Sequence, residues 1–144
     1  MARHPEHGQD STGDLLMAVT KGLRRRYMEA MLQWEVTPAQ GRALRVVHAD
    51  PGIRLSALAE ALRIAPRSAT EVVDALEARG LVTRTADPDD RRATRLSATA
   101  EGERLHGLIA AARERESAAY LEALGPDDRD RLHALLRKLV DATE

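Results

Sequence analysis

Apolar side chains recur every three or four residues over most of this chain, which is the spacing of one face of an α-helix. The pattern predicts a first amphipathic helix from Ser11, with Asp14 closing a capping box at its start. Thr37-Pro38-Ala39-Gln40 is typical of a second helix start, and the Asp50-Pro51-Gly52 turn ends that helix. The predicted inward positions of the two helices are Leu16, Val19, Leu23, Tyr27, Met31, Leu44 and Val47.

The middle of the chain predicts two short helices separated by a tight turn at Ile64-Ala65. Ile53-Arg54-Leu55 alternates as a three-residue strand does, and Ser56 is the predicted N-cap of the helix that follows. Pro66 opens the next helix, and Gly80 ends it. The predicted inward positions are Leu58, Ala59, Leu62, Ala69, Val72, Val73 and Leu76.

The periodicity changes after the fourth helix. Residues 81–85 and 94–98 have strand character, and residues 87–92 between them form a polar tip, so this segment predicts a β-hairpin. Two short helices followed directly by a charged hairpin form the winged helix-turn-helix layout. The predicted fold class is therefore mainly α with a small β-wing.

Two further helices follow the hairpin. Thr99 opens the longest helical stretch, which runs to about Leu124 before Gly125-Pro126 breaks it, and a final helix begins at Asp127. The predicted inward positions of the final helix are Leu132, Leu135, Leu136, Leu139 and Val140.

The length of 144 residues suits a single domain. We expect residues 1–10 to be a disordered tail and residues 11–144 to be the domain. Within the domain, residues 37–99 form the predicted winged helix-turn-helix, and residues 11–36 and 100–144 form a helical part.

Composition narrows the function classes. Cysteine is absent, which excludes disulfides, a thiolate metal site and a thiol redox switch. Aromatic residues make up 2% of the chain and Phe is absent, which argues against a protein that stacks single-stranded bases. The apolar stretches are too short for a membrane span, and the polar N-terminus does not resemble a signal peptide. We therefore expect a soluble, cytoplasmic protein with no membrane partner.

Charge favours nucleic-acid binding only by its placement. The net charge is −1, and seven arginines stand against six acidic residues between Arg63 and Arg95. An α-helix fits the major groove with its N-terminal residues near base edges, and a narrow minor groove attracts arginine. The candidate DNA-binding residues at the helix start and on the hairpin are Arg67, Ser68, Thr70, Glu71, Arg91, Arg92 and Arg95.

The central segment resembles MarR-family transcriptional regulators. The run from Leu58 to Val82 is similar to the third and fourth helices of that family. Asp87-Pro88-Asp89-Asp90-Arg91-Arg92-Ala93 resembles its wing, and Thr99-Ala100-Glu101-Gly102 resembles the start of its fifth helix. The motif match covers about residues 55–102, and the order of elements matches over about residues 11–142.

The resemblance implies a two-fold homodimer whose recognition helices enter successive major grooves of a pseudo-palindromic operator in double-stranded DNA. It implies that Arg92 enters the minor groove while Asp90 orients its guanidinium. It also implies a small-molecule inducer bound where the first, second and fifth helices meet, with Trp34 as a candidate lid. The candidate dimerisation residues are Leu16, Leu132, Leu135, Leu136 and Leu139.

Three of the assigned binding residues have a purely structural alternative. Arg92 can be a solvated loop residue paired with Asp90, Ser68 can cap its own helix, and Trp34 can be a packing residue. The histidines predict no metal site and no cofactor, because His48, His106 and His133 have no metal-ligand spacing and His4 and His7 lie in the predicted tail.

Two function classes stay open. The first is a sequence-specific DNA-binding regulator, usually a repressor, relieved by a ligand. The second is a dimeric helical module whose winged part binds protein, which the net charge of −1 motivates. We do not expect an enzyme, because the sequence has no nucleophile–base pair at recognisable spacing, no Gly-rich phosphate loop and no metal cluster.

Overall fold

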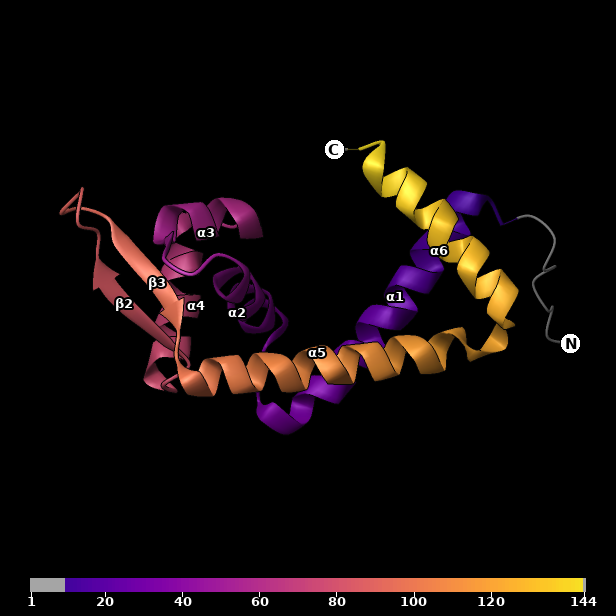
Figure 1. The fold of residues 1–144 in the computed structure, drawn as a ribbon, viewed down its shortest axis with the longest axis horizontal. Helices are drawn as coiled ribbons and strands as arrows, with labels where there is room; N and C mark the ends of the chain where they lie inside the picture. The colour runs from indigo at the N-terminus through magenta and orange to yellow at the C-terminus, as the bar shows by residue number, and fades with distance from the viewer. Residues whose placement is uncertain (1–9, 144) are drawn as a thin grey trace, which may run out of the picture. The chain divides into compact units, whose positions relative to one another are not determined.

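The computed structural model describes residues 10–143 (Figure 1). All but the last residue of the predicted tail, residues 1–10, therefore lies outside the described residues. The chain forms two compact units. The larger is Met28–Ala112, and the smaller combines Met1–Tyr27 with Arg113–Glu144 as far as these are described.

The larger unit packs three helices beside a three-stranded antiparallel sheet. Its elements are η1 (Leu32–Trp34), α2 (Pro38–Ala49), β1 (Ile53–Arg54), α3 (Leu55–Leu62), α4 (Pro66–Ala78), β2 (Val82–Ala86) and β3 (Thr94–Ala98). The strand order is β1-β3-β2, so the hairpin strands are neighbours and β1 pairs with β3. Ile53 lies opposite Leu96, and Val82 lies opposite Ala98. The predicted fold class, mainly α with a small β-wing, is confirmed.

A local signal explains where α2 begins, but the start of α3 has no such signal. Thr37 caps α2, because its hydroxyl accepts the backbone N–H of Gln40 at 3.2 Å and the Gln40 side chain accepts the Thr37 N–H at 3.2 Å. The prediction for Ser56 is wrong. Helix α3 begins at Leu55 with Arg54 as N-cap and no side-chain cap, so Ser56 lies inside the first turn and β1 is shortened to two residues.

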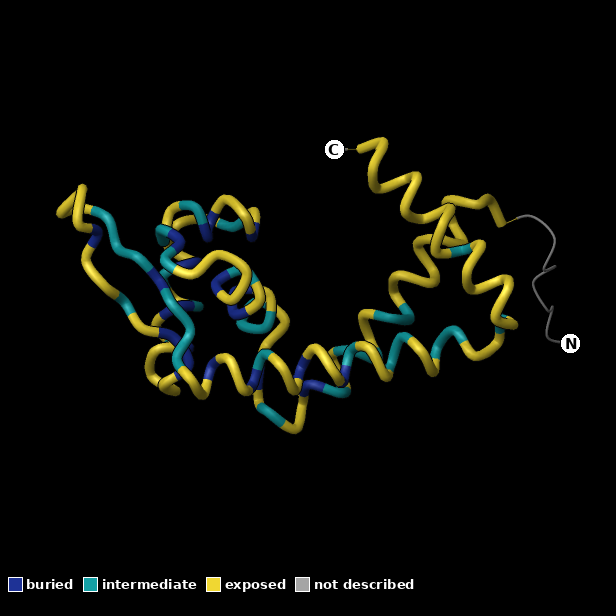
Figure 2. The backbone as a smooth tube through the Cα atoms, viewed as in Figure 1, coloured by how far each residue is buried: buried dark blue, intermediate teal, exposed yellow. Residues whose placement is uncertain are grey.

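Figure 2 shows the buried residues gathered in the larger unit, where aliphatic side chains build the core. Its largest fully buried side chains are Leu44, Val47, Leu58, Val73, Leu76, Val82 and Leu96. The first half of α5 (Ala100–Tyr120) joins this core through Leu105 and Ile109. Val72 is half-buried rather than fully inside, but the other predicted inward positions of α2, α3 and α4 are buried.

The smaller unit is held together by contacts between the first helix and the second half of α5. This first helix is α1 (Thr12–Met31), which belongs to the smaller unit up to Tyr27. The unit also contains η2 (Leu121–Ala123) and α6 (Pro126–Asp141). Arg26 Nη1 donates to Glu116 Oε2 at 3.2 Å, and the hydroxyls of Tyr27 and Ser117 are hydrogen-bonded. The Arg113 guanidinium lies 4.6 Å from the centre of the Tyr27 ring, a cation–π contact.

Most of the apolar stripe of α6 is exposed in the single chain, although the sequence pattern places it inside. Leu135 is 58% exposed and Leu139 is 56% exposed, and Leu16 on α1 is 40% exposed. An apolar helix face needs a second apolar surface to cover it, and the described residues provide none for this stripe. Despite these faces, no helix in the described part of the chain has both the length and the apolar character needed to cross a membrane.

The start of α5 lies close against the end of the helix-turn-helix. The Thr99 hydroxyl donates to the Gly80 carbonyl at 2.6 Å and accepts the Gly102 N–H at 3.0 Å. A Cβ atom on Gly102 would lie 2.0 Å from the backbone oxygen of Leu81. Only glycine therefore permits this approach of helix to backbone.

Two substitutions on α5 should have opposite effects on stability. Gly102→Ala should lower the free energy of unfolding by about 1–3 kcal/mol or more, because the new methyl group displaces the Leu81 backbone. Gly107→Ala should raise it by about 0.5–1 kcal/mol, because a Cβ there meets nothing within 4 Å and alanine is the better helix former. Urea denaturation measures both, and equal effects would contradict the close approach at Gly102.

Candidate nucleic-acid interface

A groove of about 350 Å³ separates the start of the helix-turn-helix from the tip of the wing. Its walls come from β1, from the first turns of α3 and α4, and from the turn and first residue of β3. The lining residues are Arg54, Leu55, Ser56, Pro66, Thr70, Asp90, Arg92, Ala93 and Thr94. Three predicted site residues, Thr70, Asp90 and Arg92, thus line one groove although 20 or more positions separate Thr70 from the other two.

The first turn of α4 presents polar side chains to solvent. Ala65 is the N-cap with no side-chain bond, so the alternative that Ser68 caps its own helix is wrong. Arg67 and Ser68 are exposed, and the Thr70 hydroxyl donates to the Pro66 carbonyl at 3.0 Å. Arg67 also forms an exposed ion pair with Glu71 at 3.6 Å, a contact weak enough for a ligand to replace.

Asp90 organises the backbone of the wing tip. Its Oδ1 accepts the backbone N–H of Arg92 at 2.9 Å, and its carbonyl accepts the N–H of Ala93 at 3.0 Å. This geometry differs from the expected one, because the Asp90 carboxylate holds the Arg92 amide and not its guanidinium. The guanidinium groups of Arg91 and Arg92 have no hydrogen-bond or ion-pair partner among the described residues, so both are available to a ligand.

Asp87 ties the base of the wing tip to β1 and β3. Its side chain is fully buried, and its Oδ2 accepts from Arg54 Nε at 2.8 Å and from Arg95 Nε at 3.0 Å. Its Oδ1 accepts the backbone N–H of Asp89 at 2.8 Å. Two guanidinium groups share one carboxylate, so the cluster carries one positive charge in excess beside the groove.

Sequence reasoning missed Asp87 and assigned Arg95 to DNA. Arg95 already has partners in its own chain, because its Nη1 also donates to the Gly52 carbonyl at 3.2 Å, although its side chain is still 37% exposed. The only sequence signal for Asp87 is that it precedes a proline at the start of the hairpin tip, where Asp commonly bonds a backbone N–H two residues on.

Acid should loosen the wing by protonating Asp87. The N–H of Asp89, and then the guanidinium groups of Arg54 and Arg95, lower the pKa of this carboxyl. A lowered folded-state pKa contributes stability above the ordinary aspartate pKa of about 4, and that stability is lost as the pH falls further. In thermal melts Asp87→Asn should lower the melting temperature at pH 7 and flatten its decline as the pH falls below about 4, the ordinary aspartate pKa.

Asp89→Asn is the matched control, because Asp89 contributes its backbone N–H to the cluster and its own side chain is exposed. This variant should keep both the melting temperature and the pH dependence of the parent chain. Identical acid profiles for Asp87→Asn and the parent would show that the carboxylate is not the acid-sensitive group.

Negative charge farther along α4 is partly neutralised within the fold. Arg84 on β2 donates to Asp74 at 2.5 Å and to Glu77 at 2.9 Å, and these bonds raise its pKa. The acidic residues of α4 beyond its second turn are therefore paired, which reduces their repulsion of a polyanion at the helix start.

Trp34 lies in η1 and is half-buried against the hydrophobic core of the larger unit. Its backbone carbonyl accepts from Arg79 Nη2 at 2.8 Å. This packing favours the alternative that Trp34 is a packing residue. Its role as a lid over a ligand stays a prediction.

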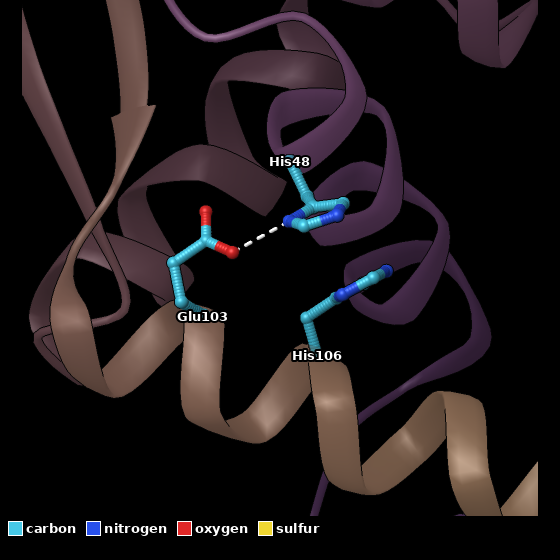
Figure 3. A group of neighbouring side chains, drawn as sticks. All are labelled: His48, Glu103 and His106. Carbon is cyan, nitrogen blue, oxygen red and sulfur yellow. Dashed lines mark hydrogen bonds and ion pairs between the residues drawn. The ribbon is translucent and has the colours of Figure 1, made fainter.

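The expectation that the histidines are scattered is wrong for two of them. His48 on α2 and His106 on α5 lie face to face, with ring centroids 3.9 Å apart and planes inclined by 20° (Figure 3). Sequence spacing alone treated them as scattered, since 57 residues lie between them. His133 is on α6 in the smaller unit, whereas the pair belongs to the larger one, and His4 and His7 lie outside the described residues.

Comparison with known proteins identifies the family. The model of the MarR family matches residues 36–94, which contain α2, α3, α4 and most of the wing. The chain is also 30% identical over 129 residues to the HTH-type transcriptional repressor MdtR of Bacillus subtilis (strain 168), covering 90% of this chain and 83% of MdtR. The chain belongs to the MarR family.

Solved structures agree with this MarR-family assignment. Wild-type apo MarR from E. coli has a TM-score of 0.86 at 22% identity, over 92% of this chain and 98% of that one, which shows the shared fold. BpsR of Bordetella bronchiseptica has a TM-score of 0.73 at 25% identity, over 96% of this chain and 99% of BpsR. As a MarR-family protein, the chain is a transcriptional regulator that acts on DNA, and the groove lies within the matched winged helix fold.

Proposed function

We propose that this MarR-family regulator is a sequence-specific repressor that binds a pseudo-palindromic operator as a cytoplasmic homodimer and is released by a small molecule. The observation that carries the proposal is the groove between α4 and the wing. Thr70 lines it from the helix, Arg92 from the wing tip and Arg54 from β1. A DNA backbone that follows this groove meets polar groups from three elements at once.

The two sides of the groove suit the two grooves of DNA. The first two turns of α4 offer Arg67 and Ser68 as donors to base edges in the major groove, while the Thr70 hydroxyl, which donates to Pro66, and the Glu71 carboxylate can accept from a base amino group. Arg92, held by its backbone and unpaired at its guanidinium among the described residues, suits a narrow minor groove.

The other arginines near the groove are proposed to face DNA phosphates that lie between the major-groove and minor-groove contacts. Arg91 at the wing tip is exposed and without a partner in the described chain. Arg54 and Arg95 place excess positive charge near the groove, although the Nε of each already donates to Asp87. We assign Arg95 to this electrostatic contribution and not to a base contact.

The homodimer is supported by the apolar surface of the smaller unit. Exposed apolar side chains on α1 and α6 of the single chain need a partner surface, and a second copy supplies an identical one. The proposed dimer contacts are Leu16, Leu132, Leu135, Leu136 and Leu139. Two-fold symmetry then matches the symmetry of a pseudo-palindromic operator.

Repression and its relief are supported by the relatives. MdtR is named a transcriptional repressor, and the structure of BpsR is described as a mechanism for regulation of its DNA binding by 6-hydroxynicotinic acid. Coupling of about 1–3 kcal/mol between ligand and DNA sites changes operator affinity by roughly 5- to 150-fold. The absence of cysteine removes thiol oxidation as the signal, which leaves either a ligand, such as an aromatic acid, or no signal.

A gel-shift titration with the DNA upstream of the chain's own gene tests the proposal. We expect a tight, salt-dependent complex with that DNA and a much weaker one with a scrambled fragment of equal length. Arginine variants that lose a phosphate contact should reduce the salt slope by about one. Equally weak binding to every DNA would reject sequence-specific repression and favour the winged part as a protein-binding surface. Aromatic acids added to the complex then test release.

A further inference from the structure

The end of α2 and the start of α5 bring three potential metal ligands together within the larger unit (Figure 3). His48 comes from the last turn of α2, and Glu103 and His106 come from the first two turns of α5. One ligand atom from each residue lies within 4.8 Å of the other two. Glu103 and His106 are three positions apart on one helix, so they share a face.

The three side chains already interact without a metal ion. His48 Nδ1 lies 2.5 Å from Glu103 Oε2, and the two imidazole rings stack 3.9 Å apart. The His48 and Glu103 side chains are 44% and 45% exposed, so solvent reaches them and their pair adds little to stability. The cluster is therefore a weakly held arrangement that a stronger ligand can replace.

Two imidazoles and one carboxylate are a ligand set that suits a borderline divalent cation. Zinc sites with three protein ligands use such sets and keep a fourth position for water. Oxygen-preferring cations such as Mg²⁺ and Ca²⁺ are poorly matched to two nitrogen ligands. We propose that His48, Glu103 and His106 bind a divalent transition-metal ion of the zinc type, with solvent at the remaining position.

Binding requires a local rearrangement that the surroundings permit. In stacked rings the in-plane lone pairs run nearly parallel and do not converge on one point, so one imidazole must rotate about its side-chain bonds. His48 is exposed and can do so. His106 is half-buried, and the positive charge of Arg45 lies near it. Arg45 repels a cation, which limits the affinity.

The bound ion would link two helices that are distant in sequence. It would fasten the last turn of α2, which precedes the helix-turn-helix, to the start of α5, which follows the wing. An ion that binds the folded chain and not the unfolded one stabilises it by an amount that grows with the logarithm of the free-ion concentration above the dissociation constant, so the melting temperature rises with added metal. This inference does not depend on the proposed operator binding, and its test uses no DNA.

Thermal melting of the full chain with Zn²⁺ provides the test. Chelator-treated protein is titrated with ZnCl₂ at a fixed protein concentration, and the metal-induced shift in melting temperature is compared among variants. We expect the melting temperature of the parent chain to rise with the logarithm of the Zn²⁺ concentration, and an apparent affinity about tenfold or more weaker for His48→Gln and for His106→Gln. The metal-free melting temperature of each variant shows that it is folded.

Matched controls separate this site from the other imidazoles. His133→Gln on α6 and the double variant His4→Gln/His7→Gln should keep the full shift of the parent chain. Co²⁺ as a coloured substitute should give visible absorption that saturates at one ion per chain and is lost in His106→Gln. No shift in the parent chain, or equal shifts in the parent, His48→Gln and His106→Gln, would overturn the proposal.

Discussion

Arg92→Ala should weaken operator binding by about 30-fold or more while leaving the thermal melt nearly unchanged. A lost guanidinium contact to DNA costs about 1–3 kcal/mol, and a two-fold dimer loses one in each half-site. The fold should tolerate the change, because the Arg92 side chain is exposed and the wing tip is held by its backbone N–H, which alanine retains. Fluorescence anisotropy with labelled operator DNA measures the affinity.

Arg104→Ala is the matched control for this result. Arg104 is also exposed but lies on α5, where it pairs with Glu101 at 2.6 Å and does not line the groove. Its removal should change operator affinity by less than about twofold, since surface substitutions away from a site are nearly neutral. Unchanged affinity in Arg92→Ala would mean that the wing tip makes no DNA contact.

Leu139→Glu should dissociate the homodimer and abolish specific DNA binding. A carboxylate placed in an apolar interface without a partner costs about 3 kcal/mol or more, which weakens association over 100-fold. The single chain should stay folded, because Leu139 is 56% exposed there. Sedimentation velocity at micromolar concentration should show a monomer, and the same protein should lose operator binding because one half-site alone is too weak.

Ala134→Glu controls for the added charge and for helix propensity. Ala134 is exposed on the same helix, and at 100° per residue it points away from Leu132 and Leu139. This variant should sediment as a dimer and bind operator like the parent chain. A dimeric Leu139→Glu protein would move the interface away from the stripe of α6.

Elements whose signals are local were predictable from the sequence. The Thr37/Gln40 capping box lies within four residues, and both of its hydrogen bonds are present. Ser56 shows the limit of such signals, because the start of α3 depends on a long-range pairing. Arg54 pairs with Arg95 across the sheet, which holds Arg54 extended as the N-cap, so α3 begins at Leu55, earlier than a cap at Ser56 would place it.

Partners distant in sequence were not predictable in the same way. Asp87 reaches Arg54 across 33 positions, and this contact depends on β1 lying beside β3. The joining of His48 to His106 likewise follows from the packing of α5 against the core that α2 shares. Side-chain types show what each residue can bind, but the register of strands and the docking of helices decide what it meets.

The sequence by itself determined the order of the helices, the wing and the placement of arginine at the start of α4 and at the wing tip. These features depend on periodicity, caps and turns within a few residues. Only the tertiary structure decided that Arg95 donates to Asp87 and to the Gly52 carbonyl while Arg92 is exposed. It also decided that no described residue covers the apolar stripe of α6 in the single chain. The physical reason is that burial and ion pairing depend on contacts between distant segments, which no local pattern specifies.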